Sequence, residues 1–309
     1  MSHKLDEYLK LKRGPSENEP WAEGEFLQSI NEYILTVDKL ANLPRLNTEK
    51  YGLLFRGQAN TDWDLKPRIW RELNGIECEK ALRLEFDSIR YFRERAHLFL
   101  DTRLIPHEND PGGWLALMQH YGAPTRMLDW TTSLNVALYF AAMDYAVEKA
   151  GGTHESKAGA VWFYQIQSLL ESMERYTPVS PEEYRSILTD ADLFLEFGLK
   201  KAKPNIRMYT AGTQTERMVA QQSVLIFSDK PCCDYADSIG NALYNSNSTR
   251  KDTHPLMKIV VPANSKPKLR EYLSKLGISA RTLFPGLDGL GRTVSEILGI
   301  EQQNFYREK

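Results

Sequence analysis

The chain has 309 residues, of which 42% are hydrophobic and 26% charged, and its formal net charge is −2. These are ordinary globular values, which favour one large domain with an appended N-terminal helix, and they argue against a protein that coats nucleic acid by charge alone. No segment approaches the about 20 apolar residues that span a bilayer. The chain starts without an apolar secretory signal and has only three cysteines, so we expect a soluble cytoplasmic protein with reduced thiols.

The first part of the chain predicts two helices and one strand. Residues 1–24 are polar and contain prolines, so we expect a mobile lead-in. Residues 25–44 repeat apolar side chains every three or four positions, which predicts an amphipathic helix ended by proline. The apolar run 51–55 predicts a buried strand with Arg56 at its end. Residues 77–100 predict a long helix with one solvated face.

A second group of elements follows in the middle of the chain. Residues 114–120 predict a short helix ended by Gly122. Residues 125–130 predict a strand, and residues 134–147 predict a buried helix whose alanines allow close packing. We expect the chemistry of the protein at the junction of this strand and this helix.

The remaining pattern mixes both kinds of element. We expect a surface loop at 151–156, strands at 160–166, 223–227 and 258–261, helices at 180–197 and 268–276, and a loop insertion near 231–255. Because strands and helices do not alternate strictly, the sequence predicts an α+β fold with a mixed or mainly antiparallel central sheet flanked by helices.

Several short motifs stand in a distinctive order. They are Phe55-Arg56-Gly57, then Gln119-His120-Tyr121-Gly122-Ala123-Pro124-Thr125-Arg126-Met127-Leu128-Asp129-Trp130-Thr131, then Ala137-Leu138-Tyr139-Phe140-Ala141, Arg217-Met218-Val219-Ala220-Gln221-Gln222 and Leu283-Phe284-Pro285-Gly286-Leu287-Asp288-Gly289-Leu290. In order and spacing they resemble the bacterial-type FRG domain over about residues 45–295, and we expect the domain to span residues 45–300. That resemblance by itself implies no activity.

A more distant resemblance concerns arginine-type ADP-ribosyltransferases. Those enzymes place an arginine at the end of a first strand, a Ser/Thr-rich segment before a helix, and a glutamate near a later strand. Arg56, residues 131–133 and Glu216 follow this order. The resemblance implies an ADP-ribosyltransferase-like fold and a transferase or glycohydrolase that consumes NAD. A nucleic-acid acceptor and a role in phage defence or a toxin system belong to the same expectation, while DNA, RNA, protein and water all remain open as the acceptor.

The resemblance also implies roles for individual residues. Arg56 would bind the NAD diphosphate through bidentate hydrogen bonds, and Glu216 would stabilise the positively charged sugar or orient the acceptor. Gln221 and Gln222 are rivals for that position. Apart from the resemblance, His120 is a candidate general acid or base, because the usual histidine pKa of about 6.5 lies near neutral pH. The expected NAD-binding residues are Arg56, Gly57, Tyr121, Arg126, Thr131, Thr132 and Ser133. We further expect Arg56, His120, Arg126, Asp129 and Ser133 to converge on one polar cleft.

Structural interpretations compete with these roles. Arg56 could pair with Asp129 or Asp62 to hold a loop, and Arg126 could form an internal ion pair with Asp129. His120 could be a hydrogen-bonding residue at a helix end, and Glu216 a solvated charge. The competing function is a non-catalytic module that binds nucleotide or nucleic acid. Because the histidines are scattered without ligand spacing, we expect no metal.

Overall fold

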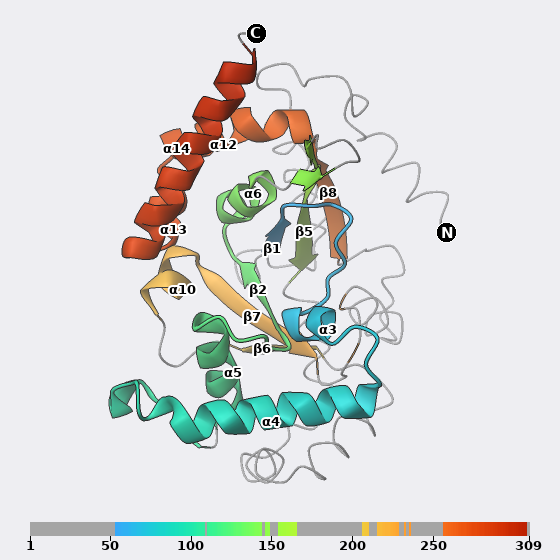
Figure 1. Cartoon of the computed structure of the whole chain (residues 1–309), viewed down its shortest axis with the longest axis vertical. Coiled ribbons are helices and arrows are strands. Elements are labelled where there is room, and N and C mark those ends of the chain that lie inside the picture. The colour runs from blue at the N-terminus through green and yellow to red at the C-terminus, as the bar shows by residue number, and fades with distance from the viewer. Residues whose placement is uncertain are drawn as a thin grey trace, which may run out of the picture.

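The computed structural model describes residues 53–108, 110–143, 146–148, 154–165, 206–209, 215–228, 232, 235 and 256–307. The predicted lead-in, the helix at 25–44, the helix at 180–197 and nearly all of the loop insertion at 231–255 lie outside these residues. Figure 1 shows the described helices and strands in colour.

Helices and strands mix along the chain, as the sequence predicts. The strands are β1 (Leu53–Gln58), β2 (Met127–Thr131), β3 (Ala146–Glu148), β4 (His154–Ser156), β5 (Gly159–Gln165), β6 (Ile206–Tyr209), β7 (Ser223–Ser228) and β8 (Leu256–Val261). The α-helices are α3 (Arg68–Glu72), α4 (Cys78–Ala96), α5 (Pro111–His120), α6 (Leu134–Ala142), α10 (Glu216–Ala220), α12 (Lys266–Lys275), α13 (Ala280–Leu283) and α14 (Leu287–Arg307). Two 3-10 helices, η1 (Thr102–Leu104) and η2 (Ala263–Ser265), complete the described elements.

Six strands form one sheet in the order β6-β7-β2-β1-β5-β8, and β3 pairs separately with β4. All of these pairings are antiparallel, which confirms the predicted α+β class with an antiparallel central sheet. Strands β1 and β5 pair over their whole length, whereas β1 and β2 share the single pair Phe55↔Thr131. Because the two central strands separate beyond that pair, side chains can enter the space between them.

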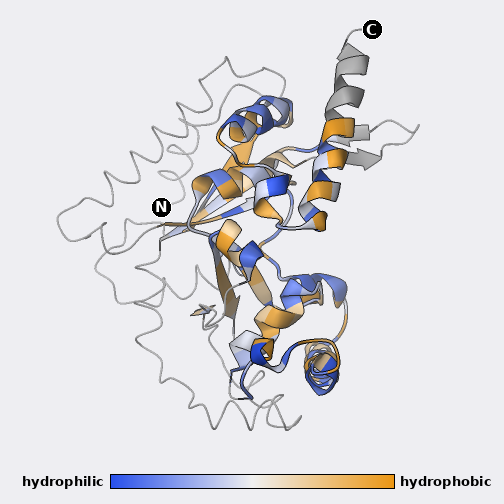
Figure 2. Ribbon diagram, turned by 90° about the vertical axis from the view of Figure 1, so that its left-hand side faces the viewer, coloured by the Kyte–Doolittle hydropathy of each residue, from blue (hydrophilic) through white to orange (hydrophobic). Residues whose placement is uncertain are grey.

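Helices gather at two ends of the sheet (Figure 1). Around α6, α12 and α13, one core cluster includes Phe55, Val161 and Phe163 from the strands. A second cluster forms between α3, α4, α5 and the strands β2 and β7. A third cluster contains Leu54 and Trp130. Their neighbours in sequence have other environments, since Phe55 belongs to the first cluster and Asp129 is exposed. Figure 2 shows the matching hydrophobic and hydrophilic stripes along the helices.

Two glycines allow α6 to lie directly against the sheet. A Cβ atom built at Gly57 would stand 1.9 Å from the carbonyl oxygen of Ala137, and one at Gly159 would stand 2.0 Å from that of Ala141. Both alanines are fully buried, which confirms the close packing expected from the small residues of this helix. The glycine of the Phe55-Arg56-Gly57 motif therefore sets the distance between β1 and α6.

Some predicted boundaries are wrong. Strand β1 continues through Arg56 to Gln58, so the arginine lies within the strand rather than at its end. Helix α6 ends at Ala142 instead of residue 147, because the backbone of Met143 is no longer helical (ψ 144°), and residues 146–148 form β3. His154–Ser156, predicted as part of a loop, is the strand β4. The short elements α3, β6, α10 and α13 were not predicted, since four or five residues carry little periodicity.

Candidate functional site

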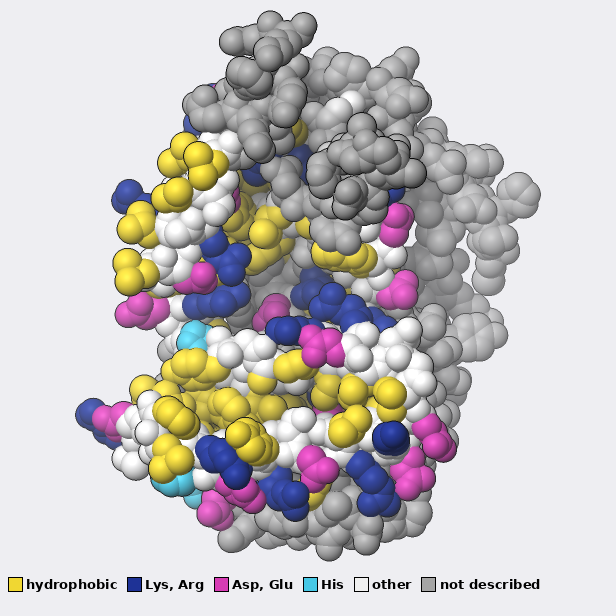
Figure 3. Space-filling model, viewed as in Figure 1, with side chains coloured by type: hydrophobic (Ala, Val, Ile, Leu, Met, Phe, Trp, Pro, Cys, Tyr) yellow, Lys and Arg dark blue, Asp and Glu magenta, His cyan; other side chains and the backbone are white. Residues whose placement is uncertain are grey.

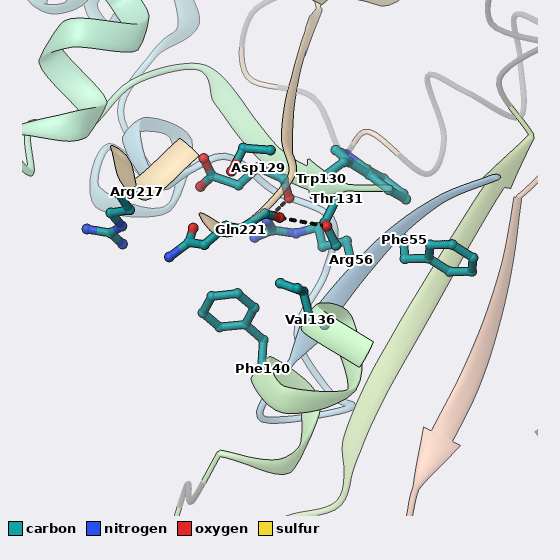
Figure 4. A pocket seen from close by; sticks show the side chains of 11 residues that line it. Phe55, Arg56, Asp129, Trp130, Thr131, Val136, Phe140, Arg217 and Gln221 are labelled. Atoms are coloured by element: carbon teal, nitrogen blue, oxygen red, sulfur yellow. Dashed lines mark hydrogen bonds between the residues drawn. The ribbon is translucent and has the colours of Figure 1, made fainter. Parts of the chain in front are cut away.

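A pocket of about 190 Å³ opens where β1, β2, α6 and α10 meet (Figure 4). It lies at the junction of β2 and α6, where the sequence places the chemistry. The residues that line it are Phe55, Arg56, Gly57, Asp129, Trp130, Thr131, Val136, Phe140, Arg217, Gln221 and Ser223. We call it the arginine pocket. In the space-filling view, Lys and Arg side chains gather along the hollow between the upper and lower parts of the described molecule (Figure 3).

Arg56 reaches from β1 across the space between the two central strands. Its Nη1 donates a hydrogen bond of 2.6 Å to the backbone carbonyl of Asp129. Its Nε is buried and has no hydrogen-bond partner among the described residues. Burial lowers the pKa of this guanidinium, the carboxylate of Asp129 opposes the shift, and the positive charge of Arg71 adds to it. The side chain nonetheless stays charged at neutral pH, so the pocket holds a positive charge that protein groups only partly satisfy.

The polar floor of the arginine pocket is fixed by hydrogen bonds. The Thr131 hydroxyl donates to the Gln221 carbonyl at 2.7 Å and accepts from the Ser133 amide at 3.0 Å. The side-chain amide of Gln221 donates to the carbonyl of Leu283 at 3.0 Å. These bonds join the end of β2 to α10 and α13, which gives the floor a defined geometry.

Asp129 supplies the carboxylate of the arginine pocket. It is the exposed centre of a strand whose other four residues are buried. Its Oδ1 accepts a 2.7 Å hydrogen bond from Nε2 of Gln119, whose Oε1 in turn accepts from the Thr125 hydroxyl. The Gln119 amide therefore orients the carboxylate. Sequence reasoning placed Asp129 in the expected polar cleft and named it as a possible ion-pair partner, but assigned it no catalytic or NAD-binding role.

Arg126 does not line the arginine pocket. It precedes β2, and its side chain turns towards α4, where Nε donates to Glu85 at 2.6 Å and Nη2 pairs with the second oxygen of the same carboxylate. Both side chains are almost completely buried. The internal ion pair expected for Arg126 therefore exists, but its partner is Glu85 and not Asp129. This corrects the expected convergence, since Arg126 belongs to the core.

Glu216 is the first residue of α10 and is exposed, and it is not among the residues that line the arginine pocket. Arg217 and Gln221 line the pocket instead, because residues four positions apart share one face of a helix. Of the two rival glutamines, Gln221 is buried at the pocket, while Gln222 is exposed in a left-handed turn with φ 47°.

The remaining Ser/Thr residues serve the local backbone. Thr132 is exposed and donates from its hydroxyl to Oε1 of Gln222 at 3.2 Å. Ser133 caps α6 by accepting a hydrogen bond from the amide of Val136. Of residues 131–133, Thr131 alone lines the arginine pocket.

His120 and Tyr121 line a second pocket of about 130 Å³, between α5, η1, β6 and the start of α10. We call it the tyrosine pocket. Its lining residues are Leu100, Arg103, Leu104, Ile105, Pro106, Asp110, Gly113, Ala116, Leu117, His120, Tyr121, Tyr209, Thr215 and Met218. Burial, and then the positive charge of Arg217, lower the pKa of His120 below 6.5. The imidazole is therefore neutral at neutral pH.

Arg217 was not predicted as a site residue. Its guanidinium lies 4.7 Å from the ring centroid of Phe284, and Arg292 from α14 lies 4.2 Å from the same ring. This stacking holds the positive charge of Arg217 beside the arginine pocket. The sequence signal was its place one residue after Glu216, within the motif that ends in the glutamine pair.

The described residues were searched for metal-binding groups and for helices that could span a membrane. They contain no group of three or more His, Cys, Asp or Glu side chains that could hold a metal ion. None of the helices searched there is long and apolar enough to cross a membrane.

Comparison with known proteins gives one family. Residues 52–150 match the family model of the FRG domain, a stretch that includes the Phe55-Arg56-Gly57 motif, β2 and α6. The match is shorter than the span over which the sequence resemblance extends. No curated protein and no solved structure matches the chain.

Proposed function

We propose that this chain, which belongs to the FRG-domain family through residues 52–150, is an ADP-ribosyltransferase-like enzyme that consumes NAD in the arginine pocket. The observation that carries the proposal is the half-buried Arg56 side chain in the pocket wall, whose buried Nε has no hydrogen-bond partner among the described residues. A buried charge without a full set of hydrogen bonds is costly, so it favours an anionic ligand.

The charges around the pocket suit a diphosphate. Arg56 and Arg217 both line the pocket, and Arg71 is close enough to influence Arg56 electrostatically. Guanidinium groups bind phosphate oxygens through paired, charge-assisted hydrogen bonds. Thr131, with its hydroxyl held by Gln221 and Ser133, offers a fixed polar wall for the sugar.

In this proposal Asp129 is the carboxylate that acts on the ribose. When the bond between ribose C1′ and the nicotinamide nitrogen breaks, its electron pair leaves with nicotinamide and the sugar becomes positively charged. A carboxylate that is already oriented lowers the energy of this state, since little reorganisation is needed. Gln119 provides that orientation through its bond to Oδ1 of Asp129. Glu216, outside the pocket lining, is assigned the other expected role of orienting the acceptor.

The acceptor and the biological role rest on the resemblance alone. We propose DNA or RNA as the acceptor and phage defence or a toxin system as the setting. The competing function, a non-catalytic module for nucleotide or nucleic acid, is favoured by one observation: the glutamate expected for catalysis is exposed and does not line the pocket.

Calorimetry with NAD and chromatography of released nicotinamide, with and without oligonucleotides, test the proposal. Asp129→Asn should slow nicotinamide release about 10²–10³-fold and leave NAD affinity nearly unchanged. Arg56→Met should weaken NAD binding about tenfold or more, because it removes charge-assisted hydrogen bonds. Arg83→Met is the matched control, since its guanidinium is exposed on α4 in an ion pair with Glu79.

Each outcome selects one function. Turnover that survives in Asp129→Asn but is lost in Glu216→Gln would return the catalytic role to the glutamate. Binding of NAD without nicotinamide release under any condition, and without a mass shift on an oligonucleotide, would establish the binding module. If NAD does not bind to the wild-type protein at all, the proposal is abandoned.

A further inference from the structure

No residue lines both pockets, but residues that follow one another in the chain connect them. On α10, Arg217 lines the arginine pocket and the next residue, Met218, lines the tyrosine pocket. On α5, Gln119 holds the Asp129 carboxylate of the arginine pocket, and the next residue, His120, lines the tyrosine pocket. The charge of Arg217 also influences His120 directly. Consecutive residues of two helices thus serve two adjacent cavities.

Neither pocket alone has the volume of a complete small-molecule site. Their volumes are about 190 and 130 Å³, whereas whole ligand sites commonly measure about 300–1,000 Å³. A ligand made of two parts joined by a linker would use both. The two arginines proposed to bind phosphate line the arginine pocket, so the second part of the ligand would extend past Arg217.

The chemistry of the tyrosine pocket differs from that of its neighbour. Apolar side chains of α5, α10 and the segment around η1 form most of its lining. At its rim, the rings of His120 and Tyr121 meet edge to face, with centroids 5.0 Å apart, and Tyr121 is 57% exposed. An exposed aromatic face beside an apolar cavity suits a flat ring system that stacks on it.

The charged groups of the tyrosine pocket favour a neutral ring. The Asp110 carboxylate is occupied, because Oδ1 accepts from the Gly113 amide and Oδ2 accepts from the Tyr209 hydroxyl, each at 2.8 Å. Arg103 is paired with Asp101, outside the lining. The positively charged nicotinamide ring of NAD is better placed near Asp129 in the arginine pocket, which leaves the neutral adenine for the tyrosine pocket.

We propose that the tyrosine pocket is a base subsite that binds the adenine of a dinucleotide whose diphosphate lies at Arg56 and Arg217. The inference rests on the proposed use of NAD, but it adds a requirement for the adenine half of the ligand. It also assigns Tyr121 a stacking role.

Calorimetry with four ligands tests the subsite: NAD, ADP-ribose, AMP and nicotinamide mononucleotide, which lacks adenine. Tyr121→Ala should weaken binding of the three adenine compounds about tenfold or more and leave nicotinamide mononucleotide unaffected, because only adenine stacks on the ring. Tyr121→Phe keeps the aromatic face and should bind like the wild type. Tyr91→Ala is the control, since it removes another exposed tyrosine, 64% accessible, from α4.

The outcomes separate this inference from the proposed function. If NAD binds with equal affinity to wild type and Tyr121→Ala, or if nicotinamide mononucleotide loses as much affinity as NAD, the adenine subsite is refuted while NAD binding stands. If ADP-ribose and AMP bind through Tyr121 but NAD is neither bound nor cleaved, the subsite stands and the proposed function fails. An oligoadenylate that binds through Tyr121 more tightly than ADP-ribose would assign the pocket to a nucleic-acid strand and overturn the dinucleotide assignment.

Discussion

Replacing Gly57 by alanine tests whether the contact between β1 and α6 is as close as the structure shows. The new Cβ would stand 1.9 Å from the Ala137 carbonyl oxygen and 2.8 Å from both the Ala141 amide nitrogen and Phe140 Cβ. Nonbonded heavy atoms normally approach to about 3.5 Å. The strand and the helix would therefore have to separate by about 1.5 Å, and two of the three nearest atoms belong to backbone that cannot rotate away.

The expected cost follows from this geometry. Overpacking a core usually lowers the free energy of unfolding by about 1–3 kcal/mol. A clash with backbone atoms, which cannot rotate away, should lower it by about 3 kcal/mol or more. A loss of about 3 kcal/mol would lower the melting temperature of a domain of this size by about 6–12 °C. Thermal unfolding followed by circular dichroism, together with urea titration, measures both quantities.

Gly291→Ala is the matched control. Gly291 lies within α14, and a Cβ there would meet nothing within 4 Å. The same substitution should raise stability there by roughly 0.5–1 kcal/mol, since alanine is the better helix former. If Gly57→Ala unfolds within about 0.5 kcal/mol of the wild type, the close approach of β1 to α6 is refuted.

Three further perturbations have expected outcomes. Glu85→Ala should destabilise the protein by about 3–5 kcal/mol in urea titrations, because it removes the carboxylate that pairs with the buried Arg126. The double variant Glu85→Ala/Arg126→Met should regain part of that stability, since it also removes the unpaired charge. Tyr235→Phe should cost about 1–3 kcal/mol in the same assay, since the buried hydroxyl accepts from the Ser228 amide and donates to the Arg126 carbonyl; an unchanged urea midpoint would contradict these bonds. The pKa of His120 is lower in the folded protein than in the unfolded chain, so the unfolded chain takes up a proton first as the pH falls. The free energy of unfolding is therefore not reduced by His120 above the usual pKa of 6.5, and it decreases as the pH drops from 6.5 towards the folded-state pKa. Urea midpoints measured between about pH 8 and pH 5 should therefore show a smaller decrease for His120→Gln than for the wild type, and identical decreases would refute the shift.

The sequence by itself determined the elements with strong periodicity. Helix α4 was predicted from its apolar face, and β7 and β8 from short β-rich runs, because these patterns depend only on neighbours along the chain. The motifs also brought out several residues that the fold places together. Arg56, Gly57, Thr131 and Gln221, all selected from the sequence, line one pocket.

Only the tertiary structure decided which partner each polar side chain has. Arg126 and Asp129 are three residues apart in one motif, yet the first pairs with Glu85 on α4 and the second faces the arginine pocket. Spacing along the chain cannot reveal this, because the partners are 41 residues away for Arg126 and 10 for Asp129. Likewise, the packing of α10 directs Arg217 and Gln221 into the pocket and leaves Glu216 exposed. The direction of a helical side chain depends on how the whole helix packs against the sheet, which the sequence alone does not show.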